Sequence, residues 1–249
     1  MTREFGTAIV SQKPQQYAVS VPYRVLACDY DGTLATKSLV DAATEQALDR
    51  WLAAGRRLVL VTGRQLPDLI SVFPRASTMF DWIVAENGPV LFRPETGQKQ
   101  LLAPPPPQAF TDLLEKQGVT PLNVGDVVVA TERNNAATVL AAIQDLGLEL
   151  EVIFNKESLM VLPNGVSKAT GLSAALRAMA VEAEEVAGIG DAENDASLLG
   201  ICGLGVAVAN AVPELKAAAD RVTRQEAGAG VAELIDDLLA HDRLPERAS

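Results

Sequence analysis

The fold class is decided by one short stretch, RVLACDYDGT at residues 24–33. Its apolar half stops abruptly at two aspartates, a glycine and a threonine. This pattern is typical of a buried parallel strand that opens into a functional loop. We therefore expect residues 24–28 to be the first strand of an α/β sheet, with chemistry at its carboxyl end.

The same alternation of apolar strands and helical segments continues along the chain. Further strands are expected at residues 57–61, 82–85, 185–190 and 205–208. Helices are expected between them, at residues 41–54, 67–73, 168–179, 195–199, 213–219 and 231–240. This rhythm predicts a doubly wound, mostly parallel α/β sheet, in which ligands bind beyond the carboxyl ends of the strands.

A long segment, residues 89–164, interrupts that rhythm. It contains a four-proline run at 104–107, which we interpret as an extended spacer. Its other expected elements are helices at 108–117 and 135–146 and strands at 127–131, 148–154 and 158–162. We interpret residues 89–164 as a small α+β cap domain inserted into a core made of residues 24–88 and 165–241.

The two ends of the chain carry weaker patterns. Residues 1–23 are expected to be an N-terminal extension, and residues 242–249 a frayed tail. The N-terminus lacks the apolar core of a signal peptide, and no window reaches the roughly 18 apolar residues of a membrane span. We therefore expect a cytoplasmic protein without a membrane partner.

Composition narrows the possible chemistry further. The chain has 32 acidic and 21 basic residues and a net charge of −11, which argues against a nucleic-acid partner. Its one histidine, His241, lies near the C-terminus, which nearly excludes Ser-His-Asp triads, Cys-His triads and His-ligated zinc. Cys28 and Cys202 are expected to be buried, reduced thiols. The enzymes that remain work with carboxylates, hydroxyls, lysine and oxygen-liganded metals.

The first acidic loop offers two carboxylates, Asp29 and Asp31. One can attack as a nucleophile, and the other can protonate a leaving oxygen and then deprotonate water. Gly32 and Thr33 follow, where backbone N–H groups can hold phosphate oxygens. The alternative is an acidic turn on the surface.

A second acidic loop, GDAEND at residues 190–195, follows another predicted strand. It gathers the hard oxygen ligands that Mg²⁺ prefers. Two such loops at neighbouring strand ends could build a metal site. The alternative is that Asn194 or Asp195 caps the helix that follows, and both readings can hold together.

Two further signals are weaker when taken alone. Thr62, Gly63 and Arg64 follow the second strand, where a hydroxyl and exposed amides can hold a phosphoryl group, or can simply form a β-turn. Lys168 begins a predicted helix and opposes its dipole. That unfavourable choice suggests that Lys168 neutralises a phosphate or a nucleophile, the alternative being an exposed surface lysine.

Together these signals resemble the four motifs of the haloacid dehalogenase-like (HAD) superfamily. The matching motifs are DYDGT at 29–33, Thr62 in VTGR, Lys168 in GVSK, and GDAEND at 190–195. The resemblance covers about residues 24–88 and 165–240. It implies a HAD-like Rossmannoid core, a Mg²⁺ cofactor and an aspartyl-phosphate intermediate.

The resemblance also assigns roles to individual residues. Asp29 is implied as the nucleophile, and Asp31 as the general acid/base with its backbone carbonyl on Mg²⁺. The implied catalytic residues are Asp29, Asp31 and Lys168. The implied phosphate-binding residues are Gly32, Thr33, Thr62, Gly63, Arg64, Lys168 and Asn194. The implied metal site is made by Asp29, Asp31, Asp191 and Asp195.

The position of the insert refines the resemblance. A long stretch separates Thr62 from Lys168, which is similar to a C2 cap of type B (subclass IIB). Glu86-Asn87-Gly88 and Asn210 resemble the Cof-like, sucrose-phosphatase-like and phosphoglycolate-phosphatase-like branch. Candidate substrate contacts, each of which could equally be a solvated loop residue, are Arg64, Arg133, Asn134, Asn155 and Lys156.

The function implied is a Mg²⁺-dependent phosphatase for a small phosphorylated metabolite, such as a sugar phosphate or a phosphoglycolate-like ester. We expect a monomer or a small homo-oligomer. One alternative is a phosphosugar mutase of the phosphomannomutase type, although those members tend to have serine where this chain has Thr62. Another is a catalytically silent sensor of a phosphometabolite. The complete motifs argue against it, because a silent descendant could freely lose Asp29 or Asp31.

Overall fold

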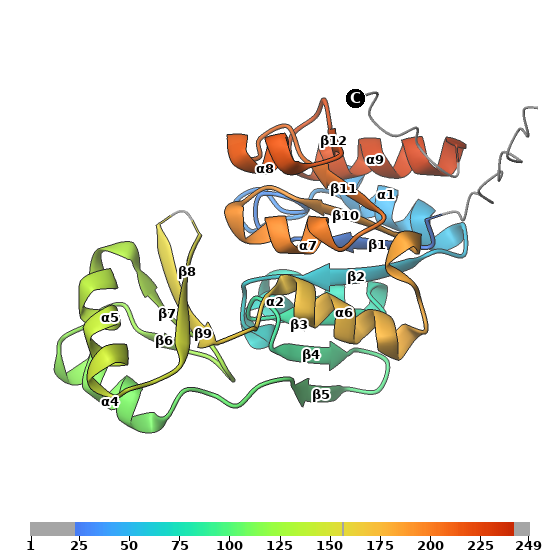
Figure 1. Cartoon of the computed structure of the whole chain (residues 1–249). Coiled ribbons are helices and arrows are strands. Elements are labelled where there is room, and N and C mark those ends of the chain that lie inside the picture. The colour runs from blue at the N-terminus through green and yellow to red at the C-terminus, as the bar shows by residue number, and fades with distance from the viewer. Residues whose placement is uncertain (1–22, 156, 242–249) are drawn as a thin grey trace, which may run out of the picture.

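The computed structural model of the protein describes residues 23–155 and 157–241. It contains a larger α/β part and a smaller α+β part, which are joined by two chain crossings (Figure 1). The larger part is built on an eight-stranded sheet and the smaller on a four-stranded sheet. Most of the expected N-terminal extension (residues 1–22) and the expected tail (residues 242–249) lie outside the described residues.

The large sheet has the strand order β12-β11-β10-β1-β2-β3-β4-β5. Its strands are β1 (Val25–Cys28), β2 (Arg57–Val61), β3 (Trp82–Ala85), β4 (Val90–Arg93), β5 (Gln98–Leu101), β10 (Val186–Gly190), β11 (Leu204–Ala207) and β12 (Arg221–Val222). Neighbours from β12 to β3 are parallel, while β4 and β5 run antiparallel. This confirms the predicted doubly wound, mostly parallel α/β class. The strand order reverses between β1 and β10, which is where such sheets bind ligands.

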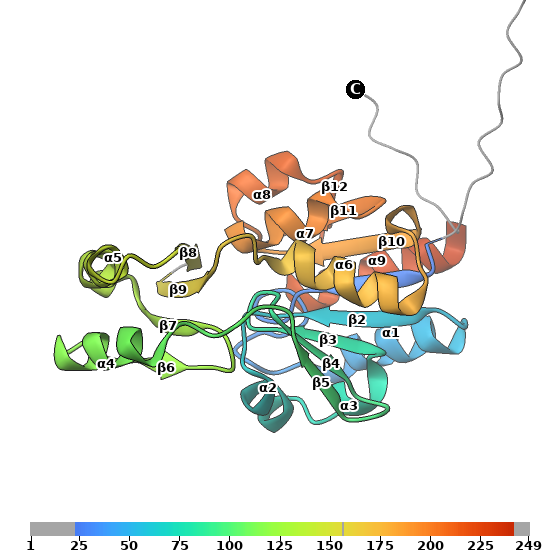
Figure 2. The same ribbon diagram turned by 60° about the horizontal axis from the view of Figure 1, so that its bottom comes forward.

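Helices cover both faces of this sheet (Figure 2). On one face lie α6 (Lys168–Met179), which contacts β2 and β3, and α7 (Ala196–Gly200), which contacts β10. On the other lie α1 (Ala42–Ala53) and α9 (Ala227–His241), which pack on each other. The remaining helices of the larger part are α2 (Leu66–Val72), α3 (Ala76–Met79) and α8 (Pro213–Ala218).

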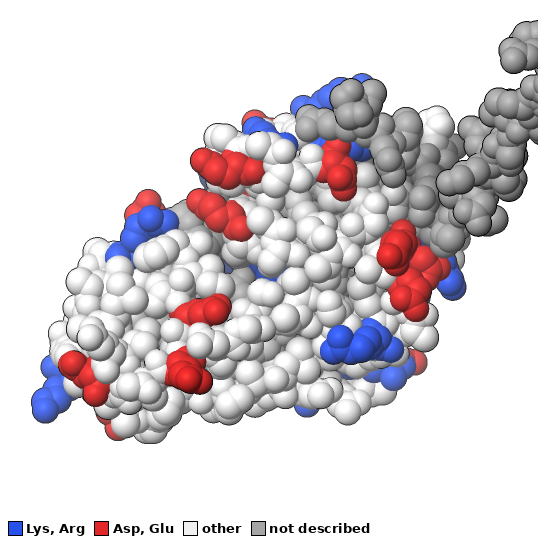
Figure 3. Space-filling model, in the orientation of Figure 1, with Lys and Arg blue, Asp and Glu red and all other residues white. Residues whose placement is uncertain are grey.

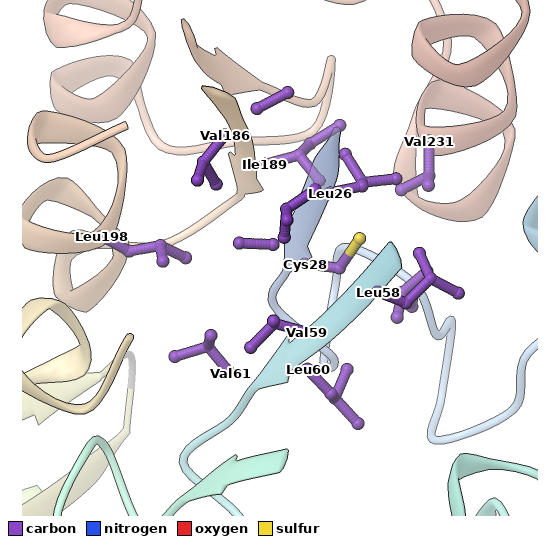
Figure 4. Packing of buried hydrophobic residues seen from close by; sticks show 14 of the residues in the cluster. Leu26, Cys28, Leu58, Val59, Leu60, Val61, Val186, Ile189, Leu198 and Val231 are labelled. Atoms are coloured by element: carbon purple, nitrogen blue, oxygen red, sulfur yellow. The ribbon is translucent and has the colours of Figure 1, made fainter. Parts of the chain in front are cut away.

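The central strands are apolar along their whole length because both of their faces are buried. In Figure 4, Leu26, Cys28, Leu58 and Leu60 point toward the side of Val231 on α9. Val59, Val61 and Val186 point to the opposite side, toward Leu198 on α7. All of these side chains belong to one buried cluster. Cys28 is a buried free thiol as expected, whereas Cys202 is only partly buried.

The large sheet extends beyond residue 88, where the sequence suggested that the inserted domain begins. β4 and β5 form a hairpin that pairs with β3, so residues 90–101 belong to the large sheet. β5 is an exposed edge strand of sequence Gln-Lys-Gln-Leu. It lacks the apolar pattern that identifies a buried strand, because ladder hydrogen bonds hold it instead of burial. The four-proline run at 104–107 follows with neither helix nor strand, as expected of a spacer.

The smaller part carries an antiparallel sheet of order β6-β7-β9-β8. Its elements are α4 (Gln108–Lys116), β6 (Asn123–Val124), β7 (Val129–Glu132), α5 (Ala136–Asp145), β8 (Leu150–Asn155) and β9 (Ser158–Pro163). Alternation along β9 divides its side chains between two faces. Leu159 and Val161 pack with Phe110 of α4, whereas Met160 and Leu162 belong to a separate cluster. One face of the small sheet is therefore covered by its helices, and the other face, which carries Met160, is turned toward the active site.

The surface carries no large patch of either sign on the face shown in Figure 3, where acidic and basic side chains form small separate groups. Within residues 23–155 and 157–241, no helix combines the length and the apolar character needed to cross a bilayer.

Candidate active site

The two acidic loops meet at the edge of the large sheet. β1 and β10 are parallel neighbours, with Cys28 opposite Ile189, so their carboxyl ends lie side by side. The Asp29 N–H continues this pairing by donating to the Ile189 carbonyl at 3.0 Å. Sheet topology therefore brings together two loops that are far apart in the sequence.

Lys168 forms the centre of the site. Its Nζ donates to Asp29 Oδ1 at 2.6 Å and to Asp195 Oδ1 at 2.5 Å. The Lys168 side chain is only 2% exposed, so the alternative of a surface lysine is excluded. Lys168 is the first residue of α6, whose N-terminus is capped by the Ser167 hydroxyl accepting from the Thr170 N–H. The cap fixes the start of the helix, and with it the direction of the lysine.

Three buried carboxylates, two of which bind this ammonium group, lie close to one another. One oxygen each from Asp29, Asp191 and Asp195 lies within 4.8 Å of the others. Asn194 adds a buried Oδ1 without a hydrogen-bond partner among the described residues. Hard oxygen donors, together with an acceptor that could receive a hydrogen bond from coordinated water, fit Mg²⁺.

Asp195 also shapes the second acidic loop. Its Oδ2 accepts the N–H groups of Asp191 and Ala192, both at 2.9 Å. It makes no side-chain cap on α7, although it is the residue before that helix. Asn194 donates to Asn87 Oδ1 at 2.9 Å. Neither side chain therefore caps α7, but the Asp195 contact with the Ala192 N–H belongs to a capping box on the short 3-10 helix Glu193–Asp195, so the capping alternative holds in part for Asp195.

Gly32 allows the first loop to approach the second. Its φ is +89°, and a Cβ atom there would lie 2.3 Å from Asp191 Oδ2. Both the backbone conformation and the space exclude a larger residue. Thr33 Oγ1 donates to Asp191 Oδ1 at 3.4 Å, and Asn210 Nδ2 donates to the Gly32 carbonyl at 2.8 Å. These contacts hold the first loop against its neighbours.

Burial and charge shift the ionisation of the central pair. Burial, reinforced by Asp195, raises the pKa of Asp29 from 3.8 to about 7, although Lys168 opposes the rise. Burial alone would lower the pKa of Lys168, but the Asp195 and Asp29 carboxylates outweigh it and raise that pKa. Lys168 therefore stays positively charged at neutral pH, whereas Asp29 holds its proton more tightly than an exposed aspartate does.

Asp31 points to a different partner. Arg64 donates to both of its oxygens, from Nε at 2.6 Å and from Nη2 at 2.8 Å. Arg64 Nη1 also donates to Asp68 at 2.7 Å, and its guanidinium lies over the Tyr30 ring at 5.3 Å. The sequence suggested Arg64 as a phosphate contact, whereas the structure gives it two carboxylate partners. Local sequence carries no clear signal for these pairings, because Arg64 precedes α2 and Asp31 lies in the loop after another strand.

Thr62 and Gly63 occupy the turn after β2. Thr62 is buried, and its Oγ1 accepts the N–H of Arg64 at 3.1 Å. A Cβ on Gly63 would lie 3.3 Å from both Asn87 and Met160, so the backbone there is closely packed. The hydroxyl thus has a turn-forming role, and Gly63 faces the pocket described next.

An open pocket of about 510 Å³ lies between the two parts of the molecule. The larger part contributes Asp29, Asp31, Gly63, Arg64, Asp68, Asp191, Ala192 and Asn194. The smaller part contributes Glu157, Ser158 and Met160 from the turn after β8 and from β9. The pocket is large enough for a small metabolite, and two of the three buried carboxylates, Asp29 and Asp191, lie along its wall.

Sequence reasoning did not assign a role to Glu86, which is buried after β3. Its carboxylate accepts the N–H groups of Asp126 at 2.8 Å and of Val127 and Val128 at 2.9 Å. Those residues belong to the smaller part, so Glu86 fastens it to the larger one. A glutamate at a strand end, within Glu86-Asn87-Gly88, was the available signal. Its partners could not be identified without the tertiary structure.

The candidate cap contacts have other surroundings. Arg133 lies over the Phe154 ring at 4.5 Å, and Asn134 Nδ2 donates to Glu132 at 3.4 Å. Neither is among the described residues that line the pocket. Asn155 ends β8, but its side chain is not described, and Lys156 lies outside the described residues.

Comparison with known proteins shows the family to which the chain belongs. The family model for haloacid dehalogenase-like hydrolases matches residues 26–120 and 115–235. The phosphoglycolate phosphatase of Methanothermobacter thermautotrophicus is 32% identical over 222 residues, spanning 85% of this chain and 97% of that protein. Phosphoglycolate phosphatase 2 of Saccharolobus solfataricus is 27% identical, spanning 87% of this chain and 92% of that protein.

Solved structures show the same fold. A haloacid dehalogenase-like hydrolase from Bacteroides thetaiotaomicron superimposes with a TM-score of 0.72 at 23% identity, covering 87% of this chain and 99% of that one. A subclass IIB sugar phosphatase superimposes with a TM-score of 0.70 at 21% identity, covering 86% and 98%. The chain therefore belongs to the haloacid dehalogenase-like hydrolase family, as a member of its phosphatase branch.

Proposed function

We propose that this chain is a Mg²⁺-dependent phosphomonoester phosphatase that hydrolyses a small metabolite, a sugar phosphate or a phosphoglycolate-like ester, through an aspartyl phosphate on Asp29. The observation that carries this proposal is the contact between Asp29 and Lys168 within the cluster of buried carboxylates, two of which, Asp29 and Asp191, line the pocket. A nucleophile, a fixed positive charge and oxygen ligands for a metal lie within one site. This combination suits phosphoryl transfer.

In the first half-reaction, the Asp29 carboxylate attacks phosphorus and the ester P–O bond breaks. The alkoxide that leaves takes a proton from Asp31, whose carboxyl group lines the same pocket. Lys168, 2.6 Å from Asp29, offsets negative charge at the attacking oxygen. The products are the free alcohol and Asp29 phosphate.

In the second half-reaction, Asp31 takes a proton from water as the water oxygen attacks phosphorus. The bond between Asp29 and phosphorus breaks, which releases inorganic phosphate and restores the carboxylate. Arg64 keeps the Asp31 carboxylate in one orientation through both steps. Met160 of the smaller part lines the pocket and offers an apolar surface to the substrate.

Mg²⁺ would be held by Asp29, Asp191 and Asp195, and by the Asp31 backbone carbonyl that the family resemblance implies. When bound, it supplies positive charge to the transferring phosphoryl oxygens. The three carboxylates support this assignment, as does the Oδ1 of Asn194, which has no hydrogen-bond partner within residues 23–155 and 157–241.

The direct test is phosphate release from a panel of phosphomonoesters, with and without Mg²⁺. We expect metal-dependent release by the wild type and none by Asp29→Asn. The matched control is Asp145→Asn, which removes an exposed carboxylate on α5 and should retain full activity. Wild-type turnover by Asp29→Asn, or equal release without divalent metal, would refute the proposal.

A further inference from the structure

We propose that the outer half of this pocket selects a substrate whose leaving group is neutral and hydroxyl-bearing, and disfavours one that carries a carboxylate. The inference rests on the proposed phosphatase function. It concerns recognition of the leaving group. The buried carboxylates and Lys168, in contrast, act on the phosphoryl group.

The pocket has two ends with different contacts. Asp29 and Asp191 are buried and line the inner end, where the phosphoryl group would bind, whereas the side chains of Asp31 and Asp68 are 45% and 54% exposed. Asp31 must reach the leaving oxygen in order to protonate it, so the leaving group extends from there. Its further surroundings are the remaining residues of the outer lining, which are Arg64 and Asp68 of the larger part and Glu157, Ser158 and Met160 of the smaller part.

The described residues of this outer half carry a net negative charge. Among the described residues that line it, Asp31, Asp68 and Glu157 are carboxylic acids and Arg64 is the one cation. A carboxylate that enters from water loses hydration and meets charges of its own sign. A neutral leaving group loses less hydration and meets no such repulsion.

Arg64 is poorly placed to compensate. Its hydrogen bonds go to Asp31 from Nε and Nη2, to Asp68 from Nη1, and to the Ser38 hydroxyl from Nη2 at 2.5 Å. Four of the five guanidinium N–H groups are therefore used. A substrate carboxylate that captured Arg64 would have to separate it from Asp31, the group that protonates the leaving oxygen. Binding energy spent in this way would disturb the acid that the reaction needs.

The smaller part presents a surface suited to hydroxyl groups. Glu157 and Ser158 are adjacent and exposed at the end of the β8–β9 hairpin, and both line the pocket. A carboxylate accepts hydrogen bonds from substrate hydroxyls, and a serine hydroxyl both donates and accepts. Met160 beside them offers an apolar surface for C–H groups. This combination favours a polyol or sugar over a short carboxylic acid.

The inference separates this chain from relatives that are named phosphoglycolate phosphatases, since the glycolate released from phosphoglycolate carries a carboxylate. The test uses two pairs of esters matched in size. Phosphoglycolate is compared with 2-hydroxyethyl phosphate, and 3-phosphoglycerate with glycerol 1-phosphate. In each pair, a carboxylate is replaced by a neutral hydroxymethyl group.

For the wild-type full chain at saturating Mg²⁺, we expect kcat/KM to be about tenfold higher for the neutral member of each pair. Glu157→Gln should lower the ratio of kcat/KM for the neutral ester to kcat/KM for the carboxylate ester about fivefold, because hydrolysis of the carboxylate ester improves. Glu115→Gln removes an exposed carboxylate on α4, away from the pocket lining, and should leave the ratio unchanged.

The outcomes distinguish this inference from the function on which it rests. Equal or faster hydrolysis of phosphoglycolate would overturn the inference while supporting the phosphatase. An unchanged ratio in Glu157→Gln would overturn the role of the outer carboxylates. No phosphate release from any of the four esters or from the wider panel would overturn both proposals.

Discussion

Arg64 and Asp31 form a bidentate ion pair, with Nε 2.6 Å from Oδ2 and Nη2 2.8 Å from Oδ1. Two parallel hydrogen bonds fix the plane of the carboxylate as well as its position. The Tyr30 ring supports the guanidinium from one side, and Asp68 binds its far end. The proposed general acid is thus oriented by a side chain that contacts it directly.

Arg64→Lys should therefore impair catalysis although it keeps the charge, because an ammonium group cannot reproduce the fork. We expect kcat to fall about tenfold to a hundredfold and KM to change less, since the orientation of Asp31 matters most in the transition state. In a single turnover, p-nitrophenyl phosphate should be affected less, because its leaving group needs no proton. An equal loss with this ester would contradict a role through Asp31.

Asp191→Asn should weaken the response to Mg²⁺. Its carboxylate lies with those of Asp29 and Asp195, against a glycine that leaves it room. We expect the Mg²⁺ concentration for half-maximal activity to rise at least about tenfold. Asp68→Asn is the matched control, since Asp68 lines the same pocket outside the metal group. A Mg²⁺ midpoint that shifts equally in both variants would argue against the assignment.

The stability of the metal-free protein should depend on Asp29. Burial raises its pKa from 3.8 to about 7, so the folded state binds this proton more tightly than the unfolded state. That contribution is fully present below pH 3.8 and is lost as the pH rises to about 7. Lys168, whose pKa is also raised, stays protonated in both states throughout this window and adds no slope.

Urea unfolding in EDTA between pH 4 and pH 8 checks this expectation. The free energy of unfolding should fall with pH more steeply for the wild type than for Asp29→Asn, with Asp145→Asn behaving like the wild type. Added Mg²⁺ should stabilise the wild type more as the pH rises, because the ionised carboxylate is the form that binds metal. Parallel pH profiles for the wild type and Asp29→Asn would show that Asp29 does not contribute.

Glu86→Gln should loosen the attachment of the smaller part. The Glu86 side chain is 1% exposed, and its two oxygens accept three backbone N–H groups. An amide would turn a donor toward one or two of those N–H groups, so we expect a loss of about 2–3 kcal/mol in unfolding free energy. Amide hydrogen exchange at residues 126–128 should accelerate.

The control for Glu86→Gln is Glu95→Gln. Glu95 is exposed and pairs with Arg93 on the surface, where an ion pair contributes little. Both variants remove one carboxylate, so a difference between them reports on the buried hydrogen bonds. Equal stability of the two variants would show that Glu86 does not fasten the smaller part.

The pattern of apolar residues predicted most of the strands of the larger part, and it missed strands that are short or lie at sheet edges. β1, β2, β3, β10 and β11 are buried on both faces, and their apolar runs predicted them. β5, β6 and β12 are short or lie at sheet edges, and their residues are exposed or half-buried. Hydrogen bonding to a neighbouring strand stabilises such segments and leaves no apolar pattern in the sequence. The extension of the large sheet to residue 101 was missed for this reason.

The candidate site was likewise predicted only in part from the sequence. Local motifs named Asp29, Asp31, Lys168, Asp191 and Asp195, since each follows an apolar strand or begins a helix. The motifs did not indicate that Asp31 turns toward Arg64, or that Asp195 binds both Lys168 and the loop that precedes it. Those pairings join residues from different strands and depend on distances that local sequence does not encode.

By itself, the sequence determined the doubly wound sheet and the loops that could carry chemistry, because strand burial and loop composition are local properties. Only the tertiary structure decided which carboxylates share Lys168, which one binds Arg64, and which residues of the smaller part face them across the pocket. The physical reason is that side-chain contacts depend on strand order and on the packing of the two parts. In this chain, parallel pairing of β1 with β10 places residues 29 and 191 beside each other, and Glu86 fastens the smaller part next to them.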